Sequence, residues 1–172
     1  KIEGKDKEAL KIFYTALYHA MIAPSTFCDV DGSYRGADGQ TYENPGYQTS
    51  PTSPLWATYR PAIPLYSIFL SERYTDMINT MLAIYKEQDK LPVWHLHGCE
   101  TNCMVGNPGI IPVADAIVKD LPGIDYELAF EAMKASALRP DRGQEHRMKY
   151  GYLPCDLMNE SVAYDLEYAL AD

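Results

Sequence analysis

Apolar residues recur at spacings of three and four along much of this chain, which is the period of one face of an α-helix. The first such segment, Lys7–Ala23, ends before Pro24 and has an apolar face made of Leu10, Phe13, Tyr14, Leu17 and Met21. No segment shows the convincing alternation of apolar and polar residues that marks a half-buried strand. The pattern therefore predicts an all-α fold of about six helices.

Two further helices are expected in the central part of the chain. The segment Leu55–Leu70 is apolar and aromatic but contains Pro61 and Pro64, so it is predicted to be a kinked helix or a helix with an extended lead-in. Ser71 is expected to cap a helix over residues 72–87. The inward stripe of that helix consists of Ile78, Met81, Leu82 and Tyr85.

Three more helices are expected towards the C-terminus. The first covers Ile110–Lys119 and is predicted to be mostly buried. Asp125 should cap the second, whose inner face consists of Leu128, Ala129, Met133 and Ala137. The third opens near Ser161 and is still running at Asp172, with apolar positions at Val162, Leu166 and Ala169.

Polar segments, residues 25–53 and 139–147, separate the predicted helices. Loops of the length of the first are uncommon unless they are functional, so function is expected in the loops. The chain of 172 residues contains no repeat of fixed period and no low-complexity tract. Residues 1–172 are therefore expected to form a single unit.

The charge balance excludes several classes of function. Asp and Glu outnumber Lys and Arg by 24 to 15, and the resulting net charge of -9 repels a nucleic-acid backbone or an anionic membrane. The apolar runs are far shorter than the roughly 20 residues of a spanning helix, and the charged first residues do not resemble a signal peptide. Neither nucleic acid nor a membrane is expected as a partner.

The chain has too few cysteines for a disulfide scaffold. Burial as free thiols is expected, because free cysteine is among the most buried residue types, and a disulfide stays open as the alternative. The four residues concerned are Cys28, Cys99, Cys103 and Cys155.

The loop over residues 98–109 contains the strongest catalytic candidate, Glu100. This carboxylate stands among small and apolar residues directly before a predicted buried helix, and such an environment raises a carboxyl pKa by desolvation. A general acid needs a raised pKa in order to hold its proton near neutral pH. On residue type alone, a helix cap or an ion-pair partner is the commoner role for a Glu in a loop.

Two other groups of residues could contact a sugar. The carboxylates of Asp29, Asp31 and Asp38 could accept hydrogen bonds from polyol hydroxyls, although simple turn formation is the alternative and the spacing does not match an EF-hand. A second group could line a sugar subsite with aromatic faces and planar donors: Trp56, Tyr59, Arg60, Trp94, His95 and His97. Core packing is the alternative for each Trp. The two histidines could bind a metal only with ligands from elsewhere.

Several motifs, in this order, resemble those of family 92 glycoside hydrolases, the calcium-dependent exo-α-mannosidases. The matching segments are Phe13–His19, Asp29–Gly36, Leu55–Arg60, Asp76–Leu82, Glu100–Gly106, Pro112–Ala116, Ser161–Val162 and Leu166–Ala169. The resemblance spans nearly all of the chain. It implies an N-terminal β-sandwich followed by an (α/α)6 toroid. These residues would form about half of the toroid.

The resemblance also implies a function. Glu100 matches the family's general acid for inverting hydrolysis, while the base and the calcium ligands are expected outside this chain. The implied substrates are terminal α-mannosides of mannose-rich N-glycans, with α-1,2 or related linkages, and the implied location is the periplasm or exterior of a bacterium. Residues expected to bind substrate are Trp56, Arg60, Asp29, Asp31 and Tyr34.

One position departs from the family pattern, because Ala57 stands where the family usually has an Asp between Trp56 and the Arg. If that carboxylate holds substrate, its loss weakens activity or alters specificity. A noncatalytic helical carbohydrate-binding or scaffold domain derived from the family is therefore the alternative function.

Overall fold

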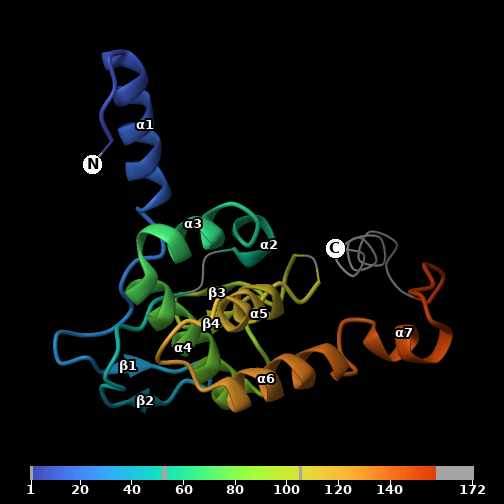
Figure 1. The fold of residues 1–172 in the computed structure, drawn as a ribbon. Helices are drawn as coiled ribbons and strands as arrows, with labels where there is room; N and C mark the ends of the chain where they lie inside the picture. Colours follow the sequence, from blue (N-terminus) through green and yellow to red (C-terminus); the bar gives the residue numbers. More distant parts are fainter. Residues whose placement is uncertain (1, 52–53, 105, 158–172) are drawn as a thin grey trace.

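The computed structural model describes residues 2–51, 54–104 and 106–157, and over these residues the chain is mostly helical (Figure 1). The helices in this part are α1 (Lys7–Ala20), α2 (Leu55–Thr58), α3 (Ala62–Phe69), α4 (Ser71–Gln88), α5 (Ile110–Val118), α6 (Tyr126–Leu138) and α7 (Gln144–Tyr150). Two antiparallel pairs of very short strands join them: β1 (Tyr34–Arg35) with β2 (Thr41–Tyr42), and β3 (His95–Leu96) with β4 (Cys99–Glu100).

The core forms around α4, which packs with α3, α5 and α6 (Figure 1). The predicted inward stripe of α4 is confirmed, because Ile78, Met81 and Leu82 are buried and Tyr85 is half-buried against the core. Tyr74 is also fully buried, and its hydroxyl lies 3.0 Å from the Pro112 carbonyl and 3.1 Å from the Asp115 carboxylate on α5. Burial of apolar side chains between these helices supplies the main stabilisation of the unit.

Helix α1 projects from this core and has no buried residue (Figure 1). Its N-terminus is capped by Asp6, whose carboxylate accepts the N–H groups of Glu8 and Ala9. At its other end the chain is tied to α3, because the Tyr66 hydroxyl lies 2.7 Å from the carbonyls of both Ala20 and Ala23. The predicted helix is therefore present, ending at Ala20, but its apolar face stays uncovered within the described residues.

Other predicted elements are confirmed with changed details. The kink expected in Leu55–Leu70 appears as two helices, α2 and α3, with Pro61 at the N-terminal boundary of α3. Asp125 caps α6 through a 3.0 Å bond from the Leu128 N–H. Ser71 does not cap α4, because it is the first helical residue and no side chain accepts a cap hydrogen bond there.

Three features differ from the sequence prediction. The long polar segment contains the β1–β2 hairpin, and the segment over residues 139–147 starts the short helix α7. The expected burial of the cysteines is wrong, since Cys99, Cys103 and Cys155 are exposed and Cys28 is half-buried, all four being free thiols. These cysteines lie in hairpins and loops rather than on inward helix faces. The helix predicted from Ser161 lies outside the described residues.

Candidate active site

Glu100 lies at the end of β4, in a hairpin whose register pairs it with His95 and pairs Leu96 with Cys99. The two turn residues, His97 and Gly98, have φ angles of 51° and 77°. Such positive values at both central positions give a turn whose twist matches that of the flanking strands. Strand pairing therefore holds Glu100 in place from one side.

This hairpin also lies against the segment that carries β1. A Cβ atom on Gly98 would come within 2.9 Å of the Phe27 ring and 3.8 Å of the Arg35 carbonyl. Only glycine combines this close approach with a positive φ. The fold thus brings the Glu100 hairpin and the β1–β2 hairpin side by side.

Backbone amides surround the Glu100 carboxylate. Oε2 accepts the Val93 N–H at 2.8 Å, and Oε1 accepts the N–H groups of Trp94 at 3.1 Å and Asn102 at 2.9 Å. The half-buried side chain is therefore held by polar donors of its own segment rather than by the apolar contacts that residue types suggested.

Three basic side chains lie near this carboxylate. Burial lowers the pKa of Lys90, although attraction to Asp141 and Glu100 opposes that shift. Burial also lowers the pKa of Arg142 and of His95, and Glu100 again opposes both shifts. His95 is only 3% exposed, so its imidazole stays neutral at pH 7 while the two cations provide positive potential around Glu100.

The predicted sugar-binding carboxylates hold a turn. Asp29 Oδ1 accepts the Val30 N–H at 2.8 Å, and Asp31 Oδ1 accepts the Ser33 N–H at 2.9 Å. The hydrogen bonds from Ser33 lower the pKa of Asp31. Each carboxylate retains further acceptor capacity, and Asp29 lines an open groove of about 720 Å³.

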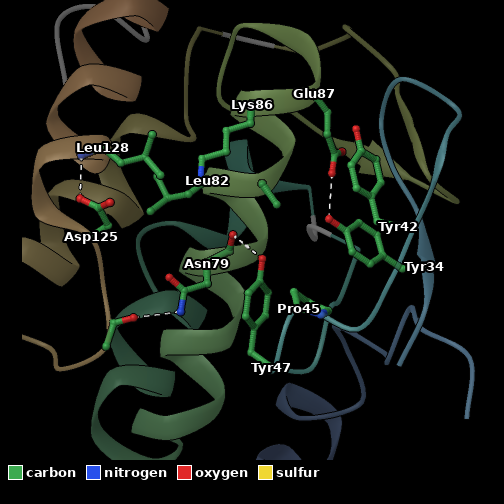
Figure 2. A pocket seen from close by; sticks show the side chains of 12 residues that line it. Tyr34, Tyr42, Pro45, Tyr47, Asn79, Leu82, Lys86, Glu87, Asp125 and Leu128 are labelled. Carbon is green, nitrogen blue, oxygen red and sulfur yellow. Dashed lines mark hydrogen bonds between the residues drawn. The ribbon is translucent and has the colours of Figure 1, made fainter. Parts of the chain in front are cut away.

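Tyr34, another predicted substrate contact, lines a groove of about 440 Å³ together with Asp29. It also lines a cavity of about 450 Å³ between the β1–β2 hairpin, α4 and α6 (Figure 2). Its hydroxyl donates to Glu87 Oε1 at 3.0 Å, and burial and this carboxylate raise the pKa of Tyr34. Glu87 Oε2 also accepts the Ala37 N–H at 2.6 Å. The Tyr34 ring stacks on Tyr42 with centroids 5.5 Å apart. Glu87, which the sequence did not single out, therefore anchors the hairpin to α4.

Trp56 and Arg60 belong to a third segment, on and just after α2. The Trp56 side chain is 36% exposed, and Ala57 beside it is exposed as well. Arg60 Nε donates to the Tyr59 hydroxyl at 2.6 Å, and its guanidinium lies 5.1 Å from the centre of that ring. No hydrogen bond within the described ranges joins any of these side chains to Glu100.

The residues present do not fit a calcium site. Among those that the structure describes, no group of three or more His, Cys, Asp or Glu side chains converges to hold a metal ion. The carboxylates of Asp29, Asp31 and Asp38 are separately engaged in local turn bonds. Calcium chemistry is therefore not assigned to these residues.

The sequence profile of the glycosyl hydrolase family 92 catalytic domain matches residues 1–172. This chain belongs to glycosyl hydrolase family 92. A family GH92 α-mannosidase from Bacteroides thetaiotaomicron has 36% identity and a TM-score of 0.86 over 91% of the family 92 chain described here. A family GH92 inverting mannosidase from Bacteroides thetaiotaomicron VPI-5482 has 26% identity and a TM-score of 0.78 over 92% of it.

The first of these relatives has also been solved in complex with mannoimidazole. An uncharacterized secreted glycosidase from Arthroderma benhamiae is 26% identical over 94% of the family 92 chain. The chain spans 22% and 23% of the two mannosidase structures and 19% of the fungal protein. The chain therefore corresponds to one segment of these longer relatives and matches part of the catalytic domain.

None of the helices in the described ranges combines the length and the apolar character that a membrane-spanning helix needs.

Proposed function

We propose that this chain is a segment of an inverting, exo-acting α-mannosidase in which Glu100 is the general acid. The observation that carries the proposal is the fixed orientation of the Glu100 carboxylate, which three backbone N–H groups hold in one place. Family membership and the inverting mannosidase among the structural relatives support it. The substrates are terminal α-mannosides of mannose-rich N-glycans, with α-1,2 or related linkages.

In this mechanism Glu100 protonates the glycosidic oxygen as the bond to the leaving group breaks. Inversion requires a second carboxylate about 6.5–9.5 Å away to activate water, and that base belongs to a part of the protein outside this chain. Trp56, Arg60, Asp29, Asp31 and Tyr34 bind substrate in this proposal. They lie in two surface segments, residues 29–34 and residues 56–60, which the remainder of the polypeptide would have to join into one cleft.

The proposal extends to the whole protein. Residues 1–172 form one unit, about half of an (α/α)6 toroid, preceded by a β-sandwich. The apolar face of α1, on which Phe13 is 36% and Tyr14 is 41% exposed, supports further helices packing beside it. Calcium, with ligands beyond the described residues, is the cofactor that the family resemblance implies. The protein acts in the periplasm or outside a bacterial cell, in keeping with the secreted fungal relative.

The test is hydrolysis of an α-mannobiose by the full-length protein, comparing the wild type with Glu100→Gln. A disaccharide has a poor leaving group, so loss of the acid should lower kcat by about 10²–10⁴-fold. Glu127→Gln, an exposed substitution of the same kind on α6, is the matched control and should keep full activity. Equal activity of wild type and Glu100→Gln would remove Glu100 from the mechanism.

Ala57 favours a second candidate, a noncatalytic carbohydrate-binding or scaffold domain. A wild-type protein that binds mannosides but hydrolyses none of them supports this candidate. Isothermal titration with mannobiose, run beside the activity assay, separates the two.

A further inference from the structure

The turn that follows Glu100 has a strained backbone. Asn102 and Met104 have φ angles of 52° and 72°, in the left-handed region that non-glycine residues rarely adopt. Such conformations persist only where surrounding contacts hold them, and they cluster at functional sites. The Asn102 N–H is also one of the three donors to Glu100, at 2.9 Å from Oε1. This turn therefore supplies one of the three contacts that orient the carboxylate.

Two cations from distant parts of the chain hold the turn. Arg142, 40 residues away in the segment between α6 and α7, donates from Nη1 to the Asn102 carbonyl at 2.6 Å and from Nη2 to the Met104 carbonyl. Lys90, just after α4, donates from Nζ to Asn102 Oδ1 at 2.6 Å. The backbone and side chain of Asn102 are thus held from two directions.

The placement of Arg142 is costly. Its own φ is 56°, its side chain is half-buried, and its Nε is shielded from solvent with no hydrogen-bond partner in the described part of the chain. Burial lowers the pKa of the guanidinium, which reflects the loss of solvation. An unsatisfied buried donor destabilises the fold, so the two carbonyl contacts must offset that penalty.

The geometry suits arginine specifically. Its planar fork reaches two carbonyls, those of residues 102 and 104, at once and fixes their separation. A lysine ammonium is a point charge on a flexible stem and cannot impose the same constraint on both.

We propose that Arg142 is a positioning residue for the acid–base chemistry of Glu100, with Lys90 as its auxiliary. Arg142 fixes the Asn102 turn, and the Asn102 N–H is one of the three donors that orient the carboxylate. This inference rests on the proposed role of Glu100 as general acid. Arg142 itself need not touch the substrate.

The experiment compares two substrates on the full-length protein. An α-mannoside with a 2,4-dinitrophenyl leaving group departs without protonation, whereas an α-mannobiose depends on the acid. A misplaced acid should lower kcat for mannobiose by about tenfold to a hundredfold, the scale of a misplacement of about 1 Å. It should change the activated substrate by less than about threefold.

The variants are Arg142→Met, which keeps length without charge, and Arg142→Lys, which keeps charge with a single donor group. The Lys variant should show a smaller but equally substrate-selective loss, and it keeps the test valid if the Met variant misfolds. Arg147→Met, an exposed substitution on α7, is the matched control and should leave both substrates unaffected.

Glu100→Gln in the same assay separates the two levels of the argument. Selective loss in Glu100→Gln together with selective loss in the Arg142 variants supports the positioning role. Selective loss in Glu100→Gln without selective loss in the Arg142 variants overturns the inference and leaves the proposed function intact. An equal loss of activity on both substrates in the Arg142 variants has the same meaning, because it shows that Arg142 has a purely structural role. No selectivity in Glu100→Gln overturns both.

Discussion

Ser136 on α6 makes a buried contact that can be tested with a matched pair of substitutions. Its Oγ accepts the Leu91 N–H at 2.8 Å and donates to the Ala132 carbonyl at 2.7 Å. Ser136 and Leu91 are each 4% exposed, so water cannot replace the bond. The residues after Leu91 supply the Val93 and Trp94 N–H groups that bind Glu100. This one hydroxyl therefore ties the Glu100 segment to α6.

Ser136→Ala would leave the Leu91 N–H buried without a partner. The expected cost is about 1–3 kcal/mol, because the donor loses its bond without regaining solvent. At 1.4 kcal/mol per factor of ten, local opening of this segment should become about 5-fold to 150-fold more frequent. The control is Thr80→Val. The buried Thr80 hydroxyl also donates to the carbonyl four residues earlier, at 2.8 Å, but within the described part of the chain it accepts no amide from another segment.

The assay is amide hydrogen exchange of the full-length protein, followed by mass spectrometry in peptides covering residues 91–100. Ser136→Ala should speed exchange there by the factor given, whereas Thr80→Val should leave it within about twofold. Equal effects of the two variants, or none in Ser136→Ala, would refute the reasoning that the Leu91 amide bond to Ser136 helps to hold this segment closed.

Three other predictions follow from single features. Gly109→Ala should lower the unfolding temperature, because the new Cβ atom would lie 2.5 Å from the Pro92 carbonyl oxygen. The control Gly4→Ala should leave the unfolding temperature unchanged, since the nearest atom to its Cβ is in a side chain 3.8 Å away. Differential scanning fluorimetry compares the two variants. Burial raises the pKa of Tyr47 from 10.0 to about 12, so the stability that this phenol contributes is complete below about pH 10 and is lost between pH 10 and 12. Thermal unfolding followed by circular dichroism should show a falling unfolding midpoint across that range, and a constant midpoint contradicts the prediction. Trp56→Ala should raise KM for mannobiose more than it lowers kcat, and an unchanged KM in steady-state kinetics removes Trp56 from the binding surface.

The helical core could be predicted because its signals are local. The spacing of Ile78, Met81 and Leu82 determines which face of α4 is buried, and the Asp125 side chain marks the start of α6. Both follow from the geometry of one helix, without knowledge of its neighbours. The two hairpins escaped prediction because strands of two residues are too short for an alternating pattern.

The candidate site was predictable only in part. Glu100 could be singled out, but its environment could not, since the donors of Val93 and Trp94 are backbone groups that any non-proline residue supplies. The contact of Arg142 with the Asn102 turn joins residues 40 apart, and nothing in one sequence pairs them. The polar character of residues 139–147 was a signal, although it also fits a simple connecting loop.

The use of peptide N–H groups at residues 93, 94 and 102 has an evolutionary consequence. A side-chain donor is lost when its codon changes, whereas a peptide donor survives every substitution except proline. Substitutions at residues 93 and 94 therefore keep the donors that orient Glu100, although packing limits residue 93, where the Val93 side chain is 1% exposed. Residue 102 has less latitude, because its positive φ favours Asn, Asp or Gly. The acid could thus outlast extensive divergence around it, and proline at residue 93 or 94 would mark lineages in which that orientation has been abandoned.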